Sequence, residues 1–175
     1  MTLTPRKMAV TGLSRGATRG LLLTGAHGVP VALGRSGRRA VKREGDGATP
    51  IGDWHPIAVL YRPDRVRRPA TKLPVRPIAP DMGWCDAPGD RNYNRPVRMP
   101  YPASAEAMWR QDGLYDLLVV LDHNRCPRMR GGGSAIFIHV ARTGFAPTEG
   151  CIALRSADLR RLLAWMVPHR RIAVL

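Results

Sequence analysis

Short apolar runs separated by turn residues recur along most of the chain, a pattern typical of many short strands. Residues 8–34 contain several such runs divided by glycines, which predicts a meander of strands. Further strands are predicted over residues 54–61, 114–122, 135–141 and 171–175. The runs at 114–122 and 135–141 are almost continuously apolar, so we expect them to be buried.

Two segments instead favour a short helix. Ser104 is a suitable N-cap for a helix through residue 110, and Ser156 can cap a second helix that ends at Pro168. The second helix would place four apolar side chains on one face, namely Leu159, Leu162, Leu163 and Met166. Many short strands with only two short helices predict a mainly β fold, either an antiparallel β sandwich or a small barrel.

Length and composition limit this picture further. The 175 residues fit a single domain, 1–175, and the apolar content of 44% is ordinary for a globular protein. Residues 45–102 are too rich in Gly, Pro, Asp and Asn for long regular elements, and residues 62–80 are expected to form a surface excursion. No apolar core of a signal peptide is visible near Arg6 and Lys7, and we expect no transmembrane segment.

The chain is strongly basic, with 28 Lys and Arg residues against 13 Asp and Glu and a formal charge of +15. Such a charge would attract a polyanion, for example nucleic acid, anionic lipid or an acidic wall polymer, unless it is simply a solvated surface. A nucleic-acid-binding module is therefore one alternative function. It is disfavoured because the strong helix, residues 157–167, needs its apolar face for packing and cannot read a groove.

One histidine and one cysteine carry the most specific chemical signal. His139 lies within an apolar run, and Cys151 follows after eleven intervening residues, directly behind Gly150. A histidine on a rigid strand can serve as the base of a cysteine nucleophile. Gly150 permits a tight turn in which backbone N–H groups converge on an oxyanion. We expect the donors to be the amides of Cys151, Gly150 and Glu149, with Thr148 steering the imidazole.

Other arrangements of these residues stay open. At least one of the three cysteines must be free, although Cys85 and Cys126 can form a disulfide, and the cysteine spacing fits no paired CxxC zinc framework. A zinc site would combine His139 and Cys151 with His123 or Cys85. A papain-like hydrolase would place its cysteine before its histidine, the reverse of the order here. We prefer the thiol and imidazole pair, with no metal and no cofactor.

The same residues resemble the YkuD-type L,D-transpeptidase catalytic domain, whose signature joins a strand histidine to Ser/Thr-x-Gly-Cys. Residues 44–52 are similar to that family's Gly-x-x-Thr-Pro-x-Gly segment, which borders the substrate cleft and here includes Thr49. Residues 83–86, 90–97 and 133–137 resemble a divergent, single-domain branch of the family. Together the similar segments extend over most of the chain.

The resemblance implies a two-step acyl transfer on peptidoglycan stem peptides in the periplasm, with carbapenem-type compounds as inhibitors. Cys151 would attack the carbonyl of diaminopimelate at the third stem position, expel the terminal D-Ala and hold a thioester. An amine acceptor would then give a 3-3 or a 1-3 cross-link. Water as the acceptor would make the same site an L,D-carboxypeptidase.

Candidate substrate contacts lie in the segments that resemble the family. Arg91 and Arg95 are expected to bind carboxylates of the donor stem, because guanidinium groups bind carboxylates bidentately. Asn92 and Tyr93 beside them would complete a polar pocket, and Trp84 is a candidate for a cleft wall. These residues would form the donor side of the site.

Three features depart from the family pattern. Glu149 stands where the family usually has His, Ala153 stands where it usually has Asn or Arg, and the gap between histidine and cysteine is shorter. Arg155 is a candidate to replace the missing polar contact. His123 is either a second imidazole of the cleft or, more in keeping with its place after a strand, a surface residue. These departures leave the acceptor amine open.

Overall fold

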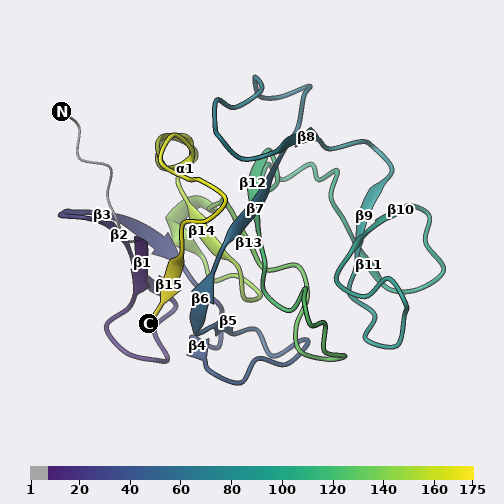
Figure 1. Ribbon diagram of the computed structural model, residues 1–175, viewed down its shortest axis with the longest axis horizontal. Coiled ribbons are helices and arrows are strands. Elements are labelled where there is room, and N and C mark those ends of the chain that lie inside the picture. The colour runs from purple at the N-terminus through teal and green to yellow at the C-terminus, as the bar shows by residue number, and fades with distance from the viewer. Residues whose placement is uncertain (1–7) are drawn as a thin grey trace.

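The computed structural model describes residues 8–175; Arg6 and Lys7, which entered the signal-peptide argument, lie outside the described residues. Its dominant feature is a curled sheet of ten strands in the order β6-β15-β1-β2-β3-β14-β13-β12-β7-β8 (Figure 1). These strands are β1 (Met8–Thr11), β2 (Arg19–Thr24), β3 (His27–Ala32), β6 (Gly52–Trp54), β7 (Pro56–Tyr61), β8 (Val75–Pro77), β12 (Leu117–Leu121), β13 (Phe137–Val140), β14 (Ile152–Leu154) and β15 (Ile172–Val174).

The path of the chain around His55 explains the curl. β6 ends at Trp54 and β7 begins at Pro56, yet β6 forms one end of the sheet and β7 lies next to the other. β6 pairs with β15, whereas β7 pairs with β12 and β8. Because two residues span at most about 7 Å, the two ends of the sheet must approach each other, and the sheet bends into a half-barrel. The single strand predicted over residues 54–61 is therefore two strands.

Smaller elements complete the fold. An antiparallel sheet of three strands, β10-β9-β11, lies to one side of the main sheet, and β4 and β5 form a parallel pair (Figure 1). Their bounds are β4 (Arg38–Arg39), β5 (Thr49–Pro50), β9 (Met82–Cys85), β10 (Pro96–Arg98) and β11 (Ala105–Ala107). Residues 8–175 contain one α-helix, α1 (Ser156–Leu163), and one 3-10 turn, Thr143–Phe145.

Apolar side chains pack on both faces of the main sheet. On β12, Leu117, Val119 and Leu121 join one cluster, whereas Leu118 and Val120 join another. Consecutive side chains of a strand point to opposite faces, so a strand buried on both sides is apolar throughout. The helix α1 packs against β13 and, together with a methionine three residues beyond its end, adds four side chains to the first cluster. They are Leu159, Leu162, Leu163 and Met166, the four predicted from their spacing.

The predicted mainly β class is confirmed, while the pairing is mixed. β1 with β15, β7 with β8, and β13 with β14 run in parallel. Parallel neighbours need a crossover connection, and residues 141–151 provide it between β13 and β14. The predicted excursion 62–80 includes the short edge strand β8. The second predicted helix is confirmed, but Arg155 rather than Ser156 is at its N-cap, and it ends at Leu163 rather than at Pro168.

The helix predicted over residues 104–110 is wrong. Ala105–Ala107 is the strand β11, which pairs with β9 through Ala105 opposite Cys85 and Glu106 opposite Trp84. A segment of this length is marginal as an isolated helix, so hydrogen bonds to a neighbouring strand decide its conformation. The extended backbone brings the Glu106 side chain to the wall of the cavity that contains Cys151.

Candidate active site

A cavity of about 480 Å³ is lined by residues of β11, β13 and the connection between β13 and β14. Cys151 and His139 both line it. In the parallel pair of strands, Ile138 lies opposite Ile152 and His139 lies opposite Ala153. Alternate residues of a strand point to the same face. Cys151, two residues before Ala153, and His139 therefore share one face of the sheet.

The Cys151 thiol is held by the backbone at the start of β13. Its Sγ accepts a hydrogen bond from the Phe137 N–H at 3.3 Å and donates one to the Ala135 carbonyl at 3.2 Å. The residue is only 8% exposed. Burial raises the pKa of the Cys151 thiol to about 12, against a smaller opposing effect of the Phe137 N–H. The resting sulfur is thus a neutral thiol.

The His139 imidazole is neutral as well, and its tautomer is fixed. Nδ1 lies 2.8 Å from the Val140 carbonyl oxygen, which only accepts hydrogen bonds, so Nδ1 carries the proton. The lone pair of Nε2 is therefore free to accept a proton. Burial lowers the pKa of His139 to about 4. The Tyr115 ring packs edge-on against the imidazole, with the ring centroids 5.4 Å apart.

The turn before β14 is shaped by Thr148 and Gly150. The Thr148 hydroxyl donates to the Cys151 carbonyl at 2.6 Å and accepts from the Gly150 N–H at 3.2 Å. Gly150 has φ of +132°, a region that favours glycine, and a Cβ at this position would lie 2.7 Å from the Ala48 carbonyl oxygen. Thr148 therefore fixes the cysteine turn itself, and its hydroxyl bonds the Cys151 carbonyl rather than the imidazole.

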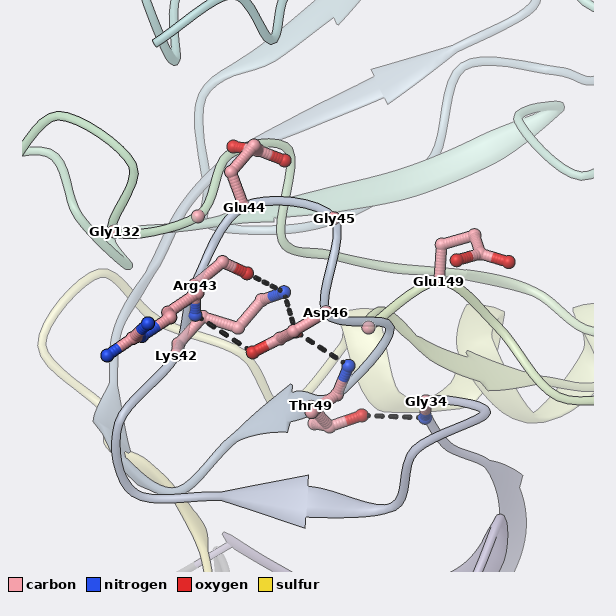
Figure 2. A network of polar contacts seen from close by, with 12 residues as sticks. Gly34, Lys42, Arg43, Glu44, Gly45, Asp46, Thr49, Gly132 and Glu149 are labelled. Atoms are coloured by element: carbon pink, nitrogen blue, oxygen red, sulfur yellow. Dashed lines mark hydrogen bonds and ion pairs between the residues drawn. The ribbon is translucent and has the colours of Figure 1, made fainter.

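Residues 42–48 form a loop that leads into β5 and lies beside the segment that carries Glu149 (Figure 2). Lys42 and Asp46 form an ion pair whose side chains are only 5% and 11% exposed. The Asp46 carboxylate also accepts hydrogen bonds from the Arg43 N–H at 2.8 Å and the Ala48 N–H at 2.9 Å. The pair thus fixes the position of Ala48, whose carbonyl packs against Gly150.

Thr49, predicted to contact substrate, lies beneath the cysteine turn. It is fully buried, and its hydroxyl accepts a hydrogen bond from the Gly34 N–H at 2.8 Å and approaches the Cys151 carbonyl at 3.5 Å (Figure 2). Glu149 lines the cavity and forms an exposed ion pair of 2.7 Å with Arg35. Of the residues predicted around Cys151, the structure therefore gathers Thr148 and Glu149 at the cavity, whereas Thr49 supports the turn.

The residues predicted to bind the donor stem do not lie at the cavity that contains Cys151. Arg91 and Arg95 are exposed, and neither lines the cavity. Asn92 donates to the Tyr101 hydroxyl at 2.9 Å, and the buried Tyr93 donates to the Glu44 carboxylate. The structure therefore does not bring these four residues to the thiol.

Three further candidates are also outside the cavity lining. Trp84 is a core residue whose indole N–H donates to the Asn94 side chain at 3.0 Å. Arg155 is exposed before α1. His123 is buried, contrary to the expected surface position, because its ring packs edge-on against Trp54 and Nε2 contacts the Gly132 carbonyl at 2.9 Å.

Four cavity residues with polar or charged side chains were not predicted from the sequence. Glu106, Arg110, Tyr115 and Arg142 all line the cavity. Arg142 follows His139 by three residues, and this proximity was an available signal. Glu106 lies on β11, which pairs with β9, and Tyr115 lies just before β12, which pairs with β13 through Leu118 opposite His139. Such long-range pairings are not revealed by local pattern.

Three further observations concern disulfides, metal binding and membrane-spanning segments. All three cysteines are free, with Cys126 exposed and Cys85 buried. Residues 8–175 contain no group of three or more His, Cys, Asp or Glu side chains arranged to hold a metal ion. None of the described helices has the length and apolar character required to cross a membrane.

A thiol, an imidazole and a tight glycine turn around one cavity are the groups that a cysteine-dependent acyl-transfer site requires. The family model of the YkuD L,D-transpeptidase catalytic domain matches residues 19–174. The chain belongs to this family of cysteine-dependent L,D-transpeptidases, whose substrate is peptidoglycan and whose usual place is the cell envelope. Neither a curated protein nor a solved structure matches the chain.

Replacing Gly150 by alanine is expected to lower the free energy of unfolding by about 2 to 4 kcal/mol, because the new Cβ meets the Ala48 carbonyl in a strained backbone region. Urea unfolding would measure the loss. Gly89→Ala is the matched control, since no atom lies within 4 Å of a Cβ there. Equal stability of the two variants would show that the turn is not tightly packed.

Proposed function

We propose that this chain acts as one L,D-transpeptidase domain in which Cys151 is the nucleophile and His139 the base. The observation that carries the proposal is the position of the two side chains, which share one face of the sheet and line one cavity. Membership of a cysteine-dependent family supports it, because of the three cysteines only Cys151 lines that cavity.

In the first step, the neutral His139 imidazole acts as the base for the neutral Cys151 thiol. Nε2 of His139 takes the Sγ proton as the sulfur attacks the diaminopimelate carbonyl at the third stem position, and a C–S bond forms. The imidazolium then gives that proton to the leaving amine as the C–N bond breaks. D-Ala departs, and a thioester remains on Cys151. Because both groups start uncharged, no buried ion pair has to be maintained between turnovers.

Backbone and basic groups complete the proposed donor site. The Gly150 N–H is engaged by Thr148. The amides of Cys151 and Glu149 are therefore our candidates for oxyanion donors. Arg142, exposed at the cavity, takes the carboxylate role that the sequence assigned to Arg91 and Arg95.

The second step transfers the acyl group to an amine and forms a 3-3 or a 1-3 cross-link, with hydrolysis to a tripeptide stem as the competing outcome. We place the reaction in the periplasm, where the family's substrate lies. Carbapenem-type compounds, whose carbonyl a thiol can attack, are expected to acylate the same sulfur.

Mass spectrometry of muropeptides from a host that lacks such enzymes tests this function. Expression of the wild-type chain in the periplasm is expected to produce new cross-linked muropeptides, and fragmentation will distinguish 3-3 from 1-3 links. Trimmed tripeptides alone would indicate the carboxypeptidase. An unchanged muropeptide profile, with the protein folded and exported, would contradict the proposal.

A further inference from the structure

The cavity has an acidic wall although the chain as a whole is strongly basic. Four carboxylate residues line it, namely Glu44, Asp86, Glu106 and Glu149. Glu44 accepts the Tyr93 hydroxyl, and Glu149 is paired with Arg35. Glu106 differs because its partners, Tyr115 and Arg110, also line the cavity.

Only one of the two carboxylate oxygens of Glu106 accepts a hydrogen bond from the protein residues that the structure describes. Oε1 accepts the Tyr115 hydroxyl at 2.8 Å and Arg110 Nη1 at 3.2 Å. Within residues 8–175, no hydrogen bond reaches Oε2. The side chain is 29% exposed, so a molecule in the cavity can contact it.

The negative charge of Glu106 is only partly balanced. Arg110 Nε lies 3.0 and 3.2 Å from the two carboxylate oxygens of Asp112, and Nη2 also donates to Asp112. Arg110 thus forms most of its hydrogen bonds with Asp112 and only one, at 3.2 Å, with Glu106. Burial raises the pKa of Glu106, and the Tyr115 hydroxyl and Arg110 oppose this effect.

Tyr115 connects this carboxylate to the proposed base. Its hydroxyl bonds Glu106, while its ring packs edge-on against the His139 imidazole. The rigid aromatic ring therefore sets where Glu106 lies relative to His139. A group that contacts Oε2 is held on the cavity side, near the thioester that Cys151 would carry.

The second half-reaction needs such a group. An amine acceptor is an ammonium near neutral pH and must lose a proton before it can attack. The His139 imidazole is neutral because burial lowers its pKa to about 4, so it offers no opposite charge to bind an ammonium. A carboxylate attracts the ammonium directly, whereas water offers no positive charge to bind.

We propose that Glu106 is the acceptor-binding residue and the base that takes the first proton of the incoming ammonium, an inference that rests on the proposed transpeptidase function. The ammonium binds Oε2 and transfers one proton to it. The free amine attacks the thioester carbonyl, the new C–N bond forms, and its second proton passes to Nε2 of His139. The C–S bond breaks, and the imidazolium returns that proton to Sγ. Glu106 then releases its proton to water.

Glu106→Gln tests this role, because the amide keeps an oxygen for Tyr115 and Arg110 and loses the charge. The full chain is supplied with a tetrapeptide stem as donor and free diaminopimelate as acceptor, and released D-Ala, amide product and hydrolysed product are measured. We expect single-turnover D-Ala release within about twofold of wild type. The ratio of amide to hydrolysed product should fall at least about tenfold, with a higher KM for the acceptor.

Two further variants keep the test decisive. Tyr115→Phe removes the hydrogen bond to Oε1 but retains the ring, and it should lower the product ratio less than Glu106→Gln. Asp81→Asn, in a surface pair with Arg98 outside the cavity, should leave the ratio unchanged. An unchanged ratio in Glu106→Gln with normal D-Ala release would overturn the role of Glu106 alone. No D-Ala release by the wild-type chain would overturn the transpeptidase function and this inference with it.

Discussion

Cys151→Ala is expected to abolish both D-Ala release from a tetrapeptide stem and the covalent adduct with a carbapenem. The methyl side chain cannot form a thioester, and no other thiol lines the cavity. Mass spectrometry of the intact protein measures the adduct as an added mass, and D-Ala release measures turnover. The expected loss of activity is complete within detection, the largest effect of any single substitution.

Cys126→Ala is the matched control for the nucleophile. Cys126 is exposed and lies outside the cavity, so its loss should leave the adduct and turnover unchanged. Alanine at Cys151 fills less volume than the thiol, and unfolding measurements establish that the variant is folded. A carbapenem adduct that persists in Cys151→Ala and disappears in Cys126→Ala would contradict the assignment of the nucleophile.

His139→Ala is expected to slow acylation of Cys151 by about 10²- to 10⁴-fold. Burial raises the pKa of the thiol to about 12, so without a base very little thiolate forms at neutral pH. The residual rate should rise with pH because hydroxide then removes the Sγ proton. Single-turnover D-Ala release between pH 6 and pH 10 measures both effects.

The wild-type pH profile provides a second check on His139. Only the neutral imidazole can accept the Sγ proton, and burial lowers its pKa to about 4. Acylation should therefore continue without loss as pH falls through 6.5, the ordinary histidine value, and decline only near pH 4. His27→Ala, at an exposed position on β3, should behave as wild type. A wild-type decline centred near pH 6.5 would contradict the buried, neutral state of His139.

Sequence reasoning succeeded where structure depends on local pattern. The apolar runs at 114–122 and 135–141 became the buried strands β12 and β13, and the helical spacing after Ser156 became α1. Burial on both faces selects apolar residues throughout, and a helix with one apolar face needs a fixed spacing. These signals lie within a few residues of one another.

The same reasoning failed where neighbours distant in sequence decide. The segment 104–110 has helix-capping residues, yet β11 forms because β9 lies beside it. Arg91 and Arg95 lie within segments that resemble the family, but their backbone places them outside the cavity. Composition suggests which arginines can bind carboxylates, whereas the fold decides that Arg142 and Arg110 are the arginines that line the cavity.

Cys151 and His139 could be proposed from the sequence alone, because a strand histidine and a glycine-led cysteine are a local signal of nucleophile chemistry. Their common face depends on the parallel register of β13 and β14, and their neutral charge depends on burial. Neither property is encoded by spacing. The proposed chemistry of the site thus follows from residue type, whereas its protonation state and acidic wall were decided by tertiary packing, which sets both solvent access and the neighbours of each titratable group.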